Sequence, residues 1–191
     1  MLNTVLGSLS SGIAAATTSF ESIATVTASG GEASLTFSSI PSTYVALQIR
    51  GLSKDGSNAS NNSLSNTINF NGDTGANYTF HRLVGNGSAA SAGGFISRTI
   101  ITVESSSIGS ATANLFGVSL VDIQDYASTT KYKTVRVFAG NDSNGVGTTN
   151  NVALSSGLWM NTNAITTILI TAAGGSFSAG STFALYGIKG A

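Results

Sequence analysis

The sequence has no cysteine, one proline, one histidine and few charged residues. Without cysteine the protein has no disulfide bond, no thiolate nucleophile and no cysteine metal ligand. Charged side chains make up 8% of the 191 residues, whereas about 25% is usual in soluble domains. Eight basic residues are balanced by eight acidic ones. This low, balanced charge argues against electrostatic binding to nucleic acid or to an anionic membrane.

Long hydrophobic runs are also missing. The most apolar stretch, residues 164–173, contains three threonines, and it has about half of the roughly 20 residues that a transmembrane helix needs. No basic residue precedes Arg50, so the charged start of a secretory signal peptide is absent. We therefore expect neither a membrane span nor a secretion signal.

Small uncharged residues dominate what is present. Serine, threonine, asparagine and glycine together account for 92 of the 191 residues. The chain is nevertheless 41% hydrophobic and contains nine phenylalanines, five tyrosines and one tryptophan. This apolar content is sufficient for a packed core, and the length is that of one ordinary domain.

Alternation with a period of two residues is the main structural signal. In residues 32–37, Ala33, Leu35 and Phe37 share one face, while Glu32, Ser34 and Thr36 share the other. Similar runs predict about ten strands, at residues 20–28, 43–52, 65–71, 78–84, 95–104, 113–124, 132–139, 151–159, 164–171 and 182–188. Because helical crossovers are missing, we expect an all-β fold, an antiparallel β-sandwich or jelly roll, with a barrel as the alternative.

The same alternation predicts the core of the domain. We expect these large side chains to be buried: Leu35, Phe37, Leu47, Ile49, Phe116, Val118, Leu120, Trp159, Ile168, Ile170, Phe183 and Leu185.

The first 18 residues differ from the remainder. Leu2, Leu6, Leu9 and Ile13 form a short apolar stripe with helical spacing. Gly7 and Gly12 interrupt it, so the segment by itself would be marginally stable. We expect either a frayed end or an arm that becomes ordered on a neighbouring subunit, with the β-sandwich domain occupying residues 19–191.

His81 is the only histidine, so it is the obvious candidate for acid–base chemistry or metal binding. It has no second histidine or cysteine as a co-ligand, and the G-x-S-x-G motif of many hydrolases does not occur. We therefore expect a histidine without a catalytic role, no metal, no cofactor and no enzymatic activity.

Asp122 and Asp125 are the closest pair of carboxylates, and paired carboxylates are what a glycosidase needs. They follow an apolar run and precede Lys131, Lys133 and Arg136. A turn with local ion pairing is the simpler interpretation, and a carbohydrate or calcium site is the alternative. The glycine-rich stretches at residues 85–88 and 174–176 precede no expected helix and lack the lysine of a phosphate-binding loop.

Several segments in order along residues 19–189 resemble a family of small virion proteins from tailed bacteriophages, especially those of marine and cyanobacterial hosts. They are residues 19–26 (SFESIATV), 39–44 (SIPSTY), 47–51 (LQIRG), 70–78 (FNGDTGANY), 122–126 (DIQDY), 131–136 (KYKTVR), 157–159 (GLW) and 183–189 (FALYGIK). The resemblance implies a non-enzymatic β-sandwich that is a component of the particle, assembled in the host cytoplasm and attached by a short N-terminal segment.

Two roles follow from this resemblance. In the first, the protein is a capsid decoration or cement protein, a homo-oligomer that docks on the major capsid protein or another virion protein. The docking residues are then expected to be Leu2, Val5, Leu6, Leu9 and Ile13. In the second, it is a tail-fibre or adhesin module whose loops bind host glycan. The chain length favours the first role, because a fibre usually needs a long trimeric shaft.

Overall fold

A computed structural model describes residues 19–56, 64–107, 114–142, 151–172 and 174–190. Within these ranges there is no helix that could cross a membrane. The described residues form twelve strands: β1 (Phe20–Thr27), β2 (Ser34–Phe37), β3 (Ala46–Ser53), β4 (Leu64–Phe70), β5 (Tyr78–Gly85), β6 (Ala90–Arg98), β7 (Ile101–Ser107), β8 (Gly117–Gln124), β9 (Lys133–Asn141), β10 (Asn151–Trp159), β11 (Ile168–Thr171) and β12 (Thr182–Ile188).

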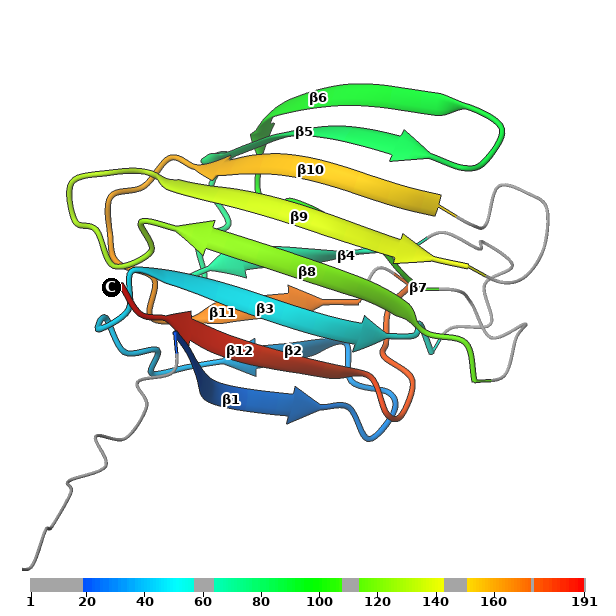
Figure 1. The fold of residues 1–191 in the computed structure, drawn as a ribbon, viewed down its shortest axis with the longest axis horizontal. Helices are drawn as coiled ribbons and strands as arrows, with labels where there is room; N and C mark the ends of the chain where they lie inside the picture. The colour runs from blue at the N-terminus through cyan, green and yellow to red at the C-terminus, as the bar shows by residue number, and fades with distance from the viewer. Residues whose placement is uncertain (1–18, 57–63, 108–113, 143–150, 173, 191) are drawn as a thin grey trace, which may run out of the picture.

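The strands form two antiparallel sheets. The large sheet has eight strands in the order β1-β12-β3-β8-β9-β10-β5-β6, and the small sheet has four in the order β2-β11-β4-β7. The small sheet lies behind the large one in Figure 1, while β5 and β6 lie at one end of the large sheet. These two sheets confirm the predicted all-β antiparallel sandwich; jelly-roll connectivity stays a prediction.

The prediction of one strand over residues 95–104 is wrong. β6 ends at Arg98 and β7 begins at Ile101, and the two strands belong to different sheets. The alternation continues through the bend at residues 99 and 100, just after Ser97 in β6, which has a φ of 53°. Ile101 is buried in the core of the sandwich. Periodicity cannot show this division, because each half alternates correctly by itself.

The predicted core is confirmed for most of its members. Buried residues between the sheets include Phe37, Leu47, Ile49, Trp159, Ile168, Ile170, Phe183 and Leu185. Leu35 is partly buried against this core, and Phe116 is also partly buried.

The predicted burial of Val118 and Leu120 is wrong. Val118 is 55% exposed, and Leu120 is only partly buried. In β8 it is Val121 and Ile123 that face the small sheet. The β8 segment is apolar on both faces, so alternation does not show which face is buried. The prediction assumed that Val118 and Leu120 share the buried face with Phe116. Phe116 precedes the strand, however, so the orientation of its side chain does not fix the orientation of residues in β8.

Trp159 lies at the centre of an aromatic cluster in the core. Its ring is stacked on Tyr78 at 6.2 Å between centroids and is tilted against Phe70 at 5.5 Å. The indole Nε1 donates a 2.8 Å hydrogen bond to Oδ2 of Asp73. The Tyr78 hydroxyl accepts a 3.0 Å bond from the Phe70 amide, and burial raises the pKa of Tyr78 to about 12. The loop that carries Asp73 is thus attached to the core.

Asp73 is a carboxylate with several donors. Burial raises its pKa, but hydrogen bonds from the Trp159 indole, the Asn77 amide and the Gly75 N–H lower it by more, so the pKa lies below its ordinary value. The Gly75 N–H is 2.9 Å from Oδ1, and Asn77 Nδ2 is 3.0 Å from Oδ2. The folded state therefore favours the ionised carboxylate.

We expect the protein to lose stability as the pH falls below about 4. Because the pKa of Asp73 is lower in the folded state, its ionised form contributes stability above the pKa of the unfolded chain. This contribution is lost as the pH falls through the folded-state pKa. Urea unfolding measured from about pH 6 to about pH 2 should therefore show a smaller decrease in the free energy of unfolding for Asp73→Asn than for the wild type. Equal losses would show that Asp73 does not cause the acid sensitivity.

Candidate functional site

The outer face of the large sheet, which points away from the small sheet, carries large apolar side chains. In β8, β9 and β10, residues on this face alternate with buried ones. Exposed fractions of 44–55% are found for Leu52, Leu83, Val118, Phe138, Val152 and Leu154. Contiguous exposed apolar surface of this kind marks a site of interaction.

Strand register arranges these side chains in two parallel rows. The first, which we call the leucine row, consists of directly opposed residues on β8, β9, β10 and β5: Leu120, Phe138, Leu154 and Leu83. The second, the glycine row, lies two residues further along the same strands: Val118, Gly140, Val152 and Gly85. Leu52 on β3 extends the glycine row, since it is opposite Val118.

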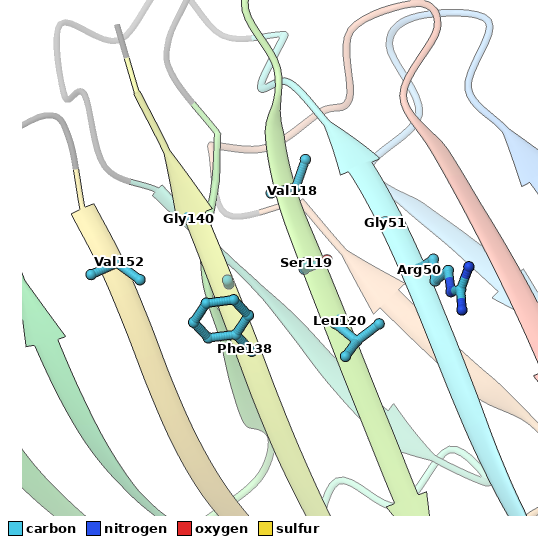
Figure 2. A pocket seen from close by; sticks show the side chains of 9 residues that line it. Arg50, Gly51, Val118, Ser119, Leu120, Phe138, Gly140 and Val152 are labelled. Atoms are coloured by element: carbon cyan, nitrogen blue, oxygen red, sulfur yellow. The ribbon is translucent and has the colours of Figure 1, made fainter.

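The glycine row contains a shallow hollow of about 480 Å³. Gly140 has no side chain, and it lies between Val118 and Val152, so the surface is lower at this point. In Figure 2, Phe138 and Leu120 stand beside the hollow, and Arg50 lies at its far side. The lining is almost entirely apolar, which suits an apolar side chain of another protein better than a polar ligand.

A polar row borders the leucine row. Its directly opposed members are Gln48, Asp122, Arg136, Ser156 and His81. Gln48 Nε2 donates a 2.9 Å hydrogen bond to Asp122 Oδ1, and Arg50 Nε donates one of 2.9 Å to Gln48 Oε1. Arg50 also lies over the rings of Phe20 and Tyr186, at 5.7 and 5.2 Å. Arg50 is therefore held at the edge of the apolar surface.

His81 belongs to this polar row. It lies opposite Ser156 on β10, and its ring lies over Gly94 on β6. Within the described residues, no group of three His, Asp or Glu side chains is placed to hold a metal ion.

The two carboxylates Asp122 and Asp125 have different partners. Asp125 lies in the turn after β8 with a φ of 55° and forms a 3.0 Å ion pair with Lys131. This pair confirms the predicted turn with ion pairing for Asp125, whereas Asp122 lies within β8. Asp122 is instead hydrogen-bonded to Gln48 across neighbouring strands.

Lys133, which the sequence suggested as an ion-pair partner, is a buried cation with a different role. It is 0% exposed. Its Nζ donates hydrogen bonds to the carbonyl oxygens of Ser128 (2.6 Å), Lys131 (2.8 Å), Asn161 (3.3 Å) and Thr162 (2.9 Å). Burial lowers its pKa, and the charge of Asp125 opposes this. The only sign of this burial in the sequence was that position 133 falls on the inward-facing side of the β9 alternation.

The glycine-rich stretches are structural turns. The Gly174 N–H donates a 2.7 Å hydrogen bond to Oδ2 of the buried Asp55. The Asn86 side chain accepts from the N–H groups of Ser88 and Ala89 at 3.0 and 2.8 Å, which closes the short turn between β5 and β6. In both stretches these backbone N–H groups donate to side chains of the protein itself.

The predicted docking residues Leu2, Val5, Leu6, Leu9 and Ile13 lie outside the described residues. The outer face was not predicted as a site, because Val118 and Leu120 were assigned to the core. The signal that could have found it is the apolar character of both faces of β8.

The comparisons with known proteins identify no relative. No protein-family model matches the chain, and the searches of curated proteins and of solved structures give no match.

Proposed function

We propose that this protein is a non-enzymatic structural protein of a tailed-phage virion, and that it is a capsid decoration or cement protein docked on the major capsid protein. The observation that carries the structural class is the outer face of the large sheet. It presents two adjacent rows of exposed apolar side chains on four neighbouring strands. Such a surface suits contact with protein. The virion assignment rests on the sequence resemblance over residues 19–189.

A tail-fibre or adhesin module that binds host glycan is the weaker candidate. A sugar is held by several polar groups placed around it, whereas the hollow beside Gly140 is lined almost entirely by apolar side chains. This apolar lining favours protein partners.

Residues 1–18 are proposed as the arm that docks on the capsid. Burying Leu2, Val5, Leu6, Leu9 and Ile13 would contribute roughly 7–15 kcal/mol in total, at roughly 1.5–3 kcal/mol each. Ordering the backbone opposes this by about 1–2 kcal/mol per residue. Ordering the whole segment therefore costs at least as much as the burial contributes, so one arm does not attach the protein by itself. Stable attachment needs help from the sandwich edge or from several arms joined in one oligomer, which raises the effective concentration of each arm.

Deleting residues 2–18 is expected to abolish co-sedimentation of the protein with phage particles. Particles that lack the protein would be mixed with wild-type or truncated protein and sedimented. Circular dichroism of the truncated protein should still show a β-rich spectrum, because the strands begin at Phe20. Normal binding of the truncated protein would show that the arm is not the anchor.

A cryo-EM map of the particle tests the assignment itself. Density for the β-sandwich on the capsid shell is expected. Density at the tail tip would instead support the adhesin, and absence of the protein from purified particles would overturn the virion role.

A further inference from the structure

We infer that the outer face of the eight-stranded sheet is where two copies of this chain bind each other face to face. The leucine and glycine rows leave several large apolar side chains about half exposed. They lie on strands in the middle of the sheet, not at its edge. A second sheet packed on this face would bury them as the small sheet buries the opposite face.

The two rows have complementary shapes under a two-fold rotation. The two-fold axis lies between the two facing sheets, perpendicular to the strands and midway between the two rows. Rotation about this axis places the leucine row of each copy opposite the glycine row of the other. On β9 this places Phe138 of one copy opposite Gly140 of the other, so that the ring enters the hollow beside this glycine. The same axis pairs Leu154 with Val152 and Leu120 with Val118. Each protruding side chain therefore meets a smaller one, as a self-complementary interface requires.

Charge supports the same arrangement. Arg136 lies on β9 two residues before Phe138, and Asp142 directly follows the last residue of β9, two residues after Gly140. The two charges are therefore at about equal distances from the axis on opposite sides. The rotation brings Arg136 of one copy opposite Asp142 of the other, and it does so twice. On β8, β9, β10 and β5 the leucine and glycine rows contain no charged residue. On β3, Arg50 lies opposite Leu120 at the end of the leucine row. The proposed interface thus has an apolar centre and oppositely charged positions at its rim, as is usual for stable interfaces.

The available area approaches that of a stable interface. Five strands, from β3 to β5 across the sheet, span about 24 Å at about 4.8 Å per strand, and eight residues along a strand span about 26 Å. The flat projection is therefore about 600 Å², and the relief of the side chains adds to it. A stable interface commonly buries about 800 Å² of accessible surface per partner.

This inference does not depend on the virion assignment. A dimer would carry two N-terminal segments, which agrees with the need for several joined arms. The dimer is tested on the purified protein alone, so its failure is distinct from failure to bind particles.

The experiment is sedimentation-velocity ultracentrifugation of the full-length chain over a wide range of concentrations. The wild type should reach the mass of a dimer. Phe138→Glu places a charge in the apolar hollow, so it should raise the dimer dissociation constant by about thirtyfold or more. Val45→Glu is the matched control, because Val45 is 58% exposed but precedes β3, outside both rows. The control should dimerise as the wild type does.

Charge reversal tests the predicted pairing. Arg136→Asp and Asp142→Arg should each weaken the dimer, and the double variant should restore it, since the opposite charges meet again. Thermal unfolding of each variant shows that it remains folded. A wild type that stays monomeric at all concentrations, or a dimer that Phe138→Glu leaves intact, would overturn the proposal. A monomer that dimerises only after deletion of residues 1–18 would also overturn it, because the N-terminal segment would then cover this face.

Discussion

Replacement of Trp159 by alanine is expected to lower the free energy of unfolding by about 3–5 kcal/mol. The side chain is fully buried and is packed between Phe70 and Tyr78. Its loss leaves a large cavity at the centre of the core. It also removes the indole N–H that donates to Asp73, which leaves a partly buried carboxylate with one donor fewer. The cavity and the lost hydrogen bond both lower the free energy of unfolding.

Urea unfolding followed by far-UV circular dichroism measures this loss. Fluorescence is unsuitable because Trp159 is the only tryptophan. Trp159→Phe should be less damaging, since it keeps most of the aromatic packing and loses the hydrogen bond. Tyr132→Ala is the control at a half-exposed position, where a loss of no more than about 1 kcal/mol is expected. Equal effects of Trp159→Ala and Tyr132→Ala would contradict the central role of the aromatic cluster.

Replacement of Lys133 by methionine is expected to lower the free energy of unfolding by about 3 kcal/mol or more. Methionine has a similar length but no donor, so four carbonyl oxygens lose the ammonium group that they share. These carbonyls belong to the segment between β8 and β9 and to the segment after β10. The lysine therefore joins two connections that are distant in the sequence.

Lys131→Met is the matched control for Lys133. The Lys131 side chain is 66% exposed, and its ion pair with Asp125 lies in solvent, so its loss should be within about 1 kcal/mol. Denaturant unfolding of both variants at neutral pH compares the two positions. A Lys133→Met protein as stable as Lys131→Met would show that water satisfies the four carbonyls when the cation is absent.

Period-two alternation was a reliable guide to the strands. Val135, Val137 and Ala139 alternate with exposed residues in β9, and the structure buries all three. The direction of successive side chains is a local property of an extended chain, so it can be predicted from the sequence. Alternation failed where both faces of a strand are apolar, as at Val118 and Leu120, and where it passes through a bend, as at residues 99 and 100. It also placed the start of β11 at residue 164, whereas this strand begins at Ile168.

Composition and local pattern by themselves thus determined the all-β class, the absence of disulfide and thiolate chemistry, and most members of the core. Tertiary structure alone decided that β6 and β7 belong to different sheets, that Lys133 is buried among carbonyls, and that the leucine and glycine rows meet on one open face. These rows join residues that are far apart in the chain, such as Leu83, Phe138 and Leu154. Their adjacency depends on strand order and register, which arise when the whole sheet assembles and buries its inner face.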